Sequence, residues 1–229
     1  MAFRRYAVYY TLEAESPLAR FGAAWLGWDV AKGQPVPHPQ VEGLPAPVSE
    51  LTETPRKYGF HATLKPPFRL AEGKSVDALA TAVERLATQG PPIRADGLVL
   101  APLGRFLALV PQGSESGLNG MAAMVVETLD SFRAPASEAE LERRRAAGLT
   151  GPQEEMLTRW GYPYVMGEFR FHMTLTGKLP KAQVAPAEAC LATALHGLLP
   201  QPFLLNGLSL VGEGEDGRFR VIHRYAFSL

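Results

Sequence analysis

Segments with strand-like and helix-like patterns alternate along the chain. Aromatic and β-branched residues dominate residues 6–12, and a helix at about 17–30 is expected next because Ser16 and Pro17 suit its first turn. The same criteria place further elements up to the end of the chain. Further strands are predicted at 60–64, 93–101, 105–111, 168–176, 203–211 and 218–227, and further helices at about 76–88, 118–132 and 186–198.

Two segments interrupt this alternation. Residues 33–47 carry five prolines and few apolar side chains, so they are expected to form a loop. Ser137 and Thr150 each begin a capping box, in which an N-cap hydroxyl and a Glu or Gln three residues later satisfy the first turn of a helix. We therefore expect a helical insert at about 133–164, after which the second half of the chain repeats the order of the first.

A five-residue pattern occurs twice. Residues 60–64 read F-H-A-T-L, just before a pair of prolines that is expected to end the strand, and residues 171–175 read F-H-M-T-L. Because strand residues two apart share a face, His61 and His172 should each lie beside a threonine, with the apolar residues on the opposite face. This pattern suits a strand that buries one face in a lobe and lines a polar cleft with the other.

The repeated histidines are candidates for acid–base catalysis. Imidazole titrates near pH 6.5, so one copy can accept a proton while the other donates one, and a bell-shaped pH profile with both limbs near neutrality is expected. The hydroxyls of Thr63 and Thr174 can bind the non-bridging oxygens of a phosphate. By strand alternation, Lys65 and Arg170 share the two polar faces and could stabilise the charge on those oxygens.

Composition narrows the remaining possibilities. The 229 residues are 46% hydrophobic and carry 23 acidic and 23 basic side chains, so a sizeable core is expected and binding to duplex nucleic acid is not. Cys190 is the single cysteine, which excludes an internal disulfide and a cysteine-based zinc site. No apolar run approaches the ~20 residues of a membrane span, so we expect a cytoplasmic protein without membrane contact. Nothing in the sequence indicates a protein partner.

The paired His-x-Thr motifs resemble those of the two-histidine (2H) phosphoesterase superfamily, which includes RNA 2′,3′-cyclic phosphodiesterases of the LigT type. Residues 56–68 and 159–165 also resemble a narrower group that is encoded in phosphonate-degradation operons. The resemblance implies a single α+β domain over residues 1–229, built from two pseudo-symmetric lobes. In such a fold, two antiparallel sheets line a central cleft and the helices lie outside.

The activity that this resemblance implies is a cyclic phosphodiesterase that opens a small phosphorylated substrate without a metal or another cofactor. For the narrower group, the implied substrate is a cyclic ribose phosphate such as 5-phosphoribosyl 1,2-cyclic phosphate. Three alternatives stay open: an RNA or nucleoside 2′,3′-cyclic phosphodiesterase, a histidine-ligated metallohydrolase, and a non-catalytic module that binds a phosphorylated ligand. No H-x-H or H-E-x-x-H pattern supports the metal site.

Several other side chains are assigned by their position. Tyr58 lies within the first matching segment, Tyr164 ends an aromatic run suited to a wall or lid, and Tyr9 falls on the less apolar face of the first strand. All three are candidates for substrate binding. The arginines at 143–145 are expected on a solvated helix face. His223 shares the face of apolar residues in the last strand, which predicts a core histidine.

Overall fold

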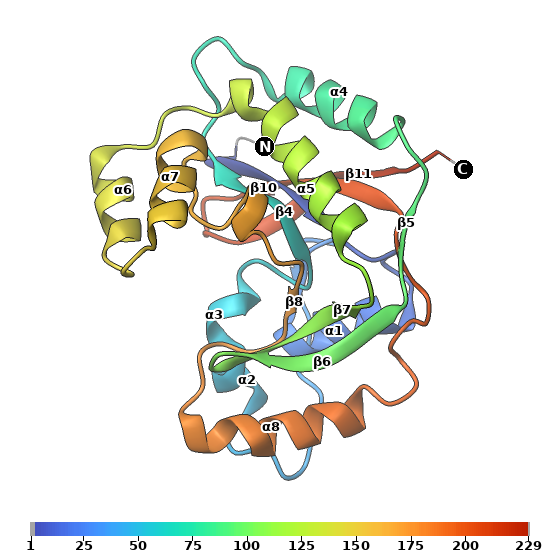
Figure 1. Cartoon of the computed structure of the whole chain (residues 1–229). Coiled ribbons are helices and arrows are strands. Elements are labelled where there is room, and N and C mark those ends of the chain that lie inside the picture. The colour runs from blue at the N-terminus through green and yellow to red at the C-terminus, as the bar shows by residue number, and fades with distance from the viewer. Residues whose placement is uncertain (1–2, 229) are drawn as a thin grey trace.

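An antiparallel sheet of seven strands runs through the computed structural model, which describes residues 3–228 (Figure 1). In order across the sheet, the strands are β11 (Phe219–Ala226), β10 (Gly207–Glu213), β1 (Arg5–Tyr10), β4 (Ala62–Phe68), β8 (Met173–Thr174), β7 (Phe106–Gln112) and β6 (Gly97–Leu103). Helices lie outside this sheet, so the predicted α+β class is confirmed.

The sheet consists of two halves that meet at the two sequence motifs. One half contains β11, β10, β1 and β4, and the other contains β8, β7 and β6. Only the pair Ala62 and Met173 joins β4 to β8. The two sheets that the family resemblance implied are therefore hydrogen-bonded into one. Two separate ribbons pair β2 (Trp28–Asp29) with β3 (Gln34–Pro35) and β5 (Ile93–Ala95) with β9 (Phe203–Leu205).

The longer helices cover the sheet and begin where capping residues were expected. Ser16 and Ser75 each accept a hydrogen bond from a backbone amide three residues later. The first of these helices is shorter than predicted because Gly27 adopts a left-handed conformation and ends it. The helices are α1 (Pro17–Leu26), α4 (Val76–Ala87) on β10 and β11, α5 (Ser116–Thr128) on β4, and α8 (Lys181–Ala194) on β6 and β7. No helix within residues 3–228 is long and apolar enough to cross a membrane.

Some predicted elements differ in extent from the observed ones. The first motif strand continues through both prolines to Phe68. Ala62 is the residue of β4 that pairs with β8, so from Thr63 to Phe68 the strand pairs with β1 alone. The edge of β4 that faces β8 needs no amide donors there, which allows the two prolines. The predicted strand at 168–176 shrinks to the two residues of β8, preceded by a 3-10 helix at Met166–Glu168. The predicted strand at 93–101 is divided into β5 and β6, and the one at 203–211 into β9 and β10. In both cases the first strand belongs to the two-stranded β5–β9 ribbon and the second to the large sheet. Two unpredicted short helices, α2 (Val48–Leu51) and α3 (Glu53–Arg56), follow the proline-rich loop.

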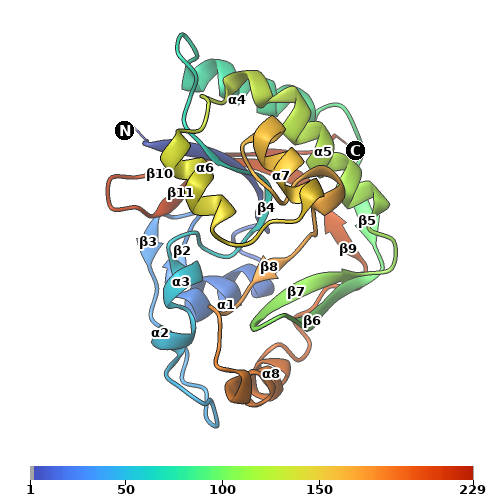
Figure 2. The ribbon, with the colours of Figure 1, turned by 60° about the vertical axis from the view of Figure 1, so that its left-hand side comes forward.

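The predicted pair of short helices is present between α5 and β8. α6 (Glu138–Arg145) and α7 (Gly151–Trp160) both begin with the expected capping boxes, at Ser137 and Thr150. The Arg145 guanidinium lies 2.9 Å from the Glu154 carboxylate and connects the two helices. They lie side by side next to the end of β4 in both views (Figures 1 and 2). This position places the helical pair beside the junction of the two half-sheets.

Candidate active site

The two motifs face each other where the half-sheets meet. Ala62 and Met173, which pair across this junction, are the central residues of the two motifs. In an antiparallel register, the neighbours of a facing pair also face each other. Each histidine is therefore opposite the threonine of the other motif, and the facing pairs are His61 with Thr174 and Thr63 with His172.

The predicted alternation of buried and accessible residues is present in both motifs. The apolar residues of each copy are at most 5% exposed and belong to the core. The histidine and threonine of each copy are partly accessible. The polar faces of two strands that are far apart in the sequence thus meet at the junction, where Thr63 lines a pocket beside each histidine.

Both imidazoles are oriented by the same backbone contact. The Nδ1 atom of His61 donates to the carbonyl oxygen of Gly59 at 2.8 Å, and the Nδ1 atom of His172 donates to that of Arg170 at 2.8 Å. Because a carbonyl can only accept, the proton of each neutral ring is on Nδ1 and Nε2 carries the lone pair. Gly59 has a φ of 73° and approaches Val30 so closely that a Cβ would lie 2.4 Å from that of Val30, so only glycine fits this turn.

The environment of His61 favours the neutral imidazole. Its ring stacks on Tyr9 with the ring centroids 3.7 Å apart, and its Nε2 atom accepts from the Thr63 hydroxyl at 2.9 Å. The pKa of His61 is lowered from 6.5 to about 4, chiefly by burial; the bond to the Gly59 carbonyl opposes this shift, and the nearby His172 adds a smaller lowering. His61 is therefore uncharged near neutral pH and able to accept a proton.

Two adjoining chambers open from the motifs. The basic chamber, about 610 Å³, is lined by His61 and Thr174 together with Arg5, Lys57, Arg143 and Arg144. The aromatic chamber, about 770 Å³, is lined by His172 together with Phe106, Tyr164, Phe169 and Arg170. Thr63, Pro66 and Tyr162 line both chambers. Each volume is in the range of sites that bind small molecules.

Most residues predicted to bind substrate line these chambers. Tyr9 and Tyr58 line the basic chamber, and Tyr164 and Arg170 line the aromatic chamber. Tyr9 is fully buried, and its hydroxyl has no hydrogen-bond partner among residues 3–228. Tyr164 and Arg170 are exposed at the rim.

The expected position of Lys65 on the cleft face is wrong. Lys65 is 2% exposed, its Nζ atom donates to the carbonyl oxygen of Val126 at 3.1 Å, and it lies 3.6 Å from the Asp130 carboxylate. The cause is a bulge in β4: adjacent residues of β1 pair with Thr63 and Lys65, so Leu64 is an extra residue that reverses the alternation. The lysine points into the protein at the end of α5 and does not line either chamber.

This buried lysine predicts a pH-dependent stability. Burial lowers the pKa of Lys65 to about 8, whereas an unfolded lysine titrates near 10.4. Between these values the unfolded chain binds more protons, so the free energy of unfolding should rise with pH, by roughly 2 kcal/mol from pH 8 to 10. Lys65→Met should remove this rise. Urea unfolding of both proteins across this range measures the difference, and parallel pH dependences would contradict it.

Arg143 and Arg144 were predicted on a solvated face. Arg143 is exposed as expected and Arg144 is half-buried, and both also line the wall of the basic chamber. The sequence signal for this position was weak. It consisted of a run of arginines within the insert of a chain whose charges otherwise balance. Only the ion pair of Glu140 in α6 with Arg69, which follows β4, shows which way the run points.

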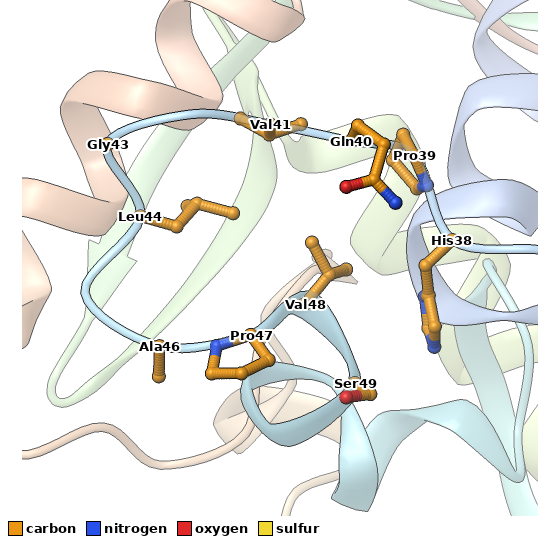
Figure 3. Close-up of a pocket in the computed structure, with 10 residues that line it drawn as sticks. All are labelled: His38, Pro39, Gln40, Val41, Gly43, Leu44, Ala46, Pro47, Val48 and Ser49. Carbon is orange, nitrogen blue, oxygen red and sulfur yellow. The ribbon is translucent and has the colours of Figure 1, made fainter.

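A separate hollow of about 410 Å³ lies beneath the proline-rich loop (Figure 3). His38 is its only titratable residue, and the Nδ1 atom of His38 donates to the Trp25 carbonyl at 3.0 Å. The remaining lining is mostly proline and aliphatic side chains. Within residues 3–228, no group of three or more His, Cys, Asp or Glu side chains is arranged to hold a metal ion.

Comparison with known proteins identifies the family. Residues 63–220 match the family described as "Protein of unknown function (DUF1045)", and the chain belongs to this family. Two curated relatives bear the name "Ribose 1,5-bisphosphate phosphokinase PhnN". The protein of Janthinobacterium sp. (strain Marseille) is 43% identical over 221 residues, covering 93% of this chain and 48% of that protein. The protein of Laribacter hongkongensis (strain HLHK9) is 36% identical over 215 residues, covering 93% and 49%. The chain spans about half the length of these curated relatives.

Solved structures of similar arrangement cover nearly all of the chain. Escherichia coli LigT complexed with NADP+ has a TM-score of 0.47 at 16% identity, with 100% of both chains covered. A protein of Thermus thermophilus has a TM-score of 0.45 at 18% identity, with 97% of both chains covered.

Proposed function

We propose that this chain is a metal-independent cyclic phosphodiesterase that opens a small cyclic phosphate. One observation carries this proposal. Two histidines from distant motifs lie at one strand junction, in adjoining chambers that share Thr63, and each ring is held through Nδ1 so that Nε2 is the nitrogen that exchanges protons. A phosphate between two such groups can be attacked from one side while its leaving group departs on the other.

The geometry supports different roles for the two histidines. Neutral His61 takes a proton from the attacking water through Nε2 while the water oxygen forms the new bond to phosphorus. The bond from phosphorus to one sugar oxygen breaks, and protonated His172 donates its Nε2 proton to that oxygen. Thr63 and Thr174 bind the non-bridging oxygens, because both line the basic chamber beside His61, and the Thr63 hydroxyl exchanges its bond to Nε2 of His61 for one to the substrate.

The proposed substrate is 5-phosphoribosyl 1,2-cyclic phosphate. The relatives' name refers to ribose 1,5-bisphosphate, which is the product when this cyclic phosphate opens at the 2-oxygen. A phosphokinase activity is not proposed for this chain. It spans about half of those proteins, and its sequence lacks the G-x-x-x-x-G-K-[ST] pattern that binds nucleotide phosphates.

The aromatic chamber favours a second candidate, a nucleoside 2′,3′-cyclic phosphate. Phe106 lies 5.8 Å from the His172 ring, and Tyr164 is exposed at the rim of the same chamber. Aromatic side chains in such a position can stack on a nucleobase. A nucleoside that has no second phosphate would leave most of the cationic side chains of the basic chamber without an anionic partner.

The test is to incubate the purified chain with each cyclic phosphate after exhaustive chelation and to identify products by phosphorus NMR. The proposal expects ring opening of the ribose compound that chelation does not reduce. A higher kcat/KM for the nucleotides would replace the substrate with the second candidate. Turnover that requires added metal, or no turnover of any cyclic phosphate, would refute the proposed mechanism.

The pH profile of this reaction should extend further into the acid range than the sequence predicted. Because the pKa of His61 is lowered to about 4, its imidazole loses the ability to accept a proton only below that pH. The acidic limb of kcat/KM should therefore lie near pH 4, instead of near the ~6.5 of an unperturbed imidazole. Initial rates at low substrate concentration measure it, and a limb near neutrality would contradict the assignment of His61 as the base.

A further inference from the structure

The basic chamber has an excess of positive charge that the catalytic mechanism does not use. Four of its lining residues are cationic, and none of its lining residues is Asp or Glu. The chain as a whole has equal numbers of acidic and basic residues, so this excess is local. Unbalanced cations around a cavity favour an anionic ligand.

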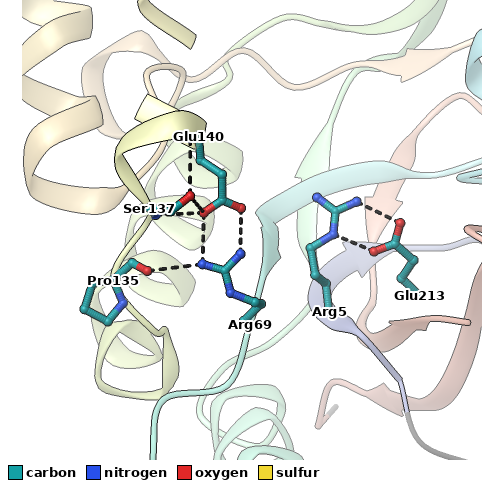
Figure 4. Close-up of polar contacts among 6 residues, drawn as sticks. All are labelled: Arg5, Arg69, Pro135, Ser137, Glu140 and Glu213. Carbon is teal, nitrogen blue, oxygen red and sulfur yellow. Dashed lines mark hydrogen bonds and ion pairs between the residues drawn. The ribbon is translucent and has the colours of Figure 1, made fainter. Parts of the chain in front are cut away.

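One of the four cations is already neutralised. Arg5 forms a two-pronged ion pair with Glu213, with its Nη2 atom 2.8 Å from the carboxylate (Figure 4). The three others, Lys57, Arg143 and Arg144, form no ion pair within the described part of the chain. Their charge is therefore available to a ligand.

Arg144 is the most constrained of the three. Its Nε atom is buried without a hydrogen-bond partner among residues 3–228, and its guanidinium lies 4.8 Å from the centroid of the Tyr162 ring. A buried charged donor without an acceptor is destabilising. The side chain of Arg144 therefore keeps this position because the residues packed around it hold it there. An anion in the chamber would lie beside this guanidinium and pair with its charge.

The insert holds these arginines toward the site. Glu140 of α6 accepts hydrogen bonds from both terminal nitrogens of Arg69, at 2.8 and 2.9 Å, and from the amide of Ser137 (Figure 4). Arg69 directly follows β4, which carries the first motif. Positions three and four residues after Glu140 share its helix face, so docking of Glu140 turns Arg143 and Arg144 to the same side.

We propose that Lys57, Arg143 and Arg144 bind a phosphate monoester of the substrate whose cyclic phosphate lies between the histidines. The site would then select a doubly phosphorylated sugar. This inference rests on the proposed function and adds a second phosphate site to it. Guanidinium groups bind phosphate through paired charged hydrogen bonds, and contacts remote from the reacting atoms raise kcat/KM by holding the substrate in position.

The test compares 5-phosphoribosyl 1,2-cyclic phosphate with ribose 1,2-cyclic phosphate, which lacks the monoester. The measured quantity is the ratio of their kcat/KM values. Arg143→Gln and Arg144→Gln should each reduce the preference for the doubly phosphorylated compound about 10- to 100-fold, as expected for loss of a hydrogen bond to a charged group. Arg145→Gln is the matched control, because Arg145 pairs with Glu138 and Glu154 and does not line the chamber.

Binding of ribose 5-phosphate, measured by calorimetry, separates this inference from the proposed reaction. Weaker binding by the Arg144→Gln variant than by the control would support the phosphate site even if neither cyclic phosphate were turned over, an outcome that would refute only the proposed function. Equal kcat/KM for the two compounds in the unsubstituted protein would overturn the inference. So would a loss of preference in Arg145→Gln as large as that in Arg144→Gln.

Discussion

Alanine at His61 or at His172 should lower kcat for the cyclic phosphate about 10²–10⁴-fold, the range for loss of one proton-transfer group. Each substitution removes the imidazole that its motif contributes to the junction, while the strand pairing of Ala62 with Met173 does not depend on the side chains. The variants should keep their fold. Single-turnover rates, with circular dichroism to confirm folding, measure the effect.

His196→Ala is the matched control. His196 is exposed after the end of α8 and lines neither chamber, so its loss should change kcat by less than about twofold. The double variant of both motif histidines should be little slower than either single variant, because the two groups act in one step. If either single variant kept a tenth or more of kcat, the acid–base assignment would be wrong.

Strand alternation predicted the direction of the side chains correctly only where the strands are regular. Within each motif the period of two holds, and His61 and His172 reach the cleft as expected. A bulge at Leu64 turns Lys65 inward. A second bulge, at Ile222 of β11, turns His223 away from the face of Phe219 and Val221, and the predicted core histidine is exposed beside Tyr225. Bulges depend on pairing with another strand, so a single sequence does not show them.

Long-range contacts explain the other differences between sequence and structure. The helical insert was predicted from its capping boxes, which are local, but the direction of Arg143 and Arg144 depends on Arg69 and Glu140, which are 71 positions apart. The strand predicted at 168–176 is only two residues long, because Met173 and Thr174 pair in register with β4 or β7, whereas the amides of Leu175 and Thr176 both donate to the Leu107 carbonyl outside the regular ladder. The apolar pattern of residues 168–176 therefore arises because side chains such as Phe171 and Leu175 are buried beside the sheet, although most of the segment is not a strand.

Trp25→Ala should have the largest effect on stability, a loss of about 3–5 kcal/mol in the free energy of unfolding. Trp25 is fully buried in α1, and its indole nitrogen donates to the Leu175 carbonyl at 2.8 Å. Leu175 ends the second motif, whose strand has one pair with β4 and two with β7. With so few strand contacts, the position of β8 depends strongly on this helix. Chemical denaturation measures the loss.

Trp25→Phe separates packing from the hydrogen bond. It retains most of the buried aromatic surface and leaves the Leu175 carbonyl without its donor, so a loss of about 1–3 kcal/mol is expected. Because Leu175 follows Thr174 in the same motif, kcat should fall in this variant even at temperatures where it is fully folded. Trp160→Ala is the control, since Trp160 is partly exposed at the end of α7 and lines neither chamber. If Trp25→Phe reduced stability without changing kcat, α1 would support the core without positioning the second motif.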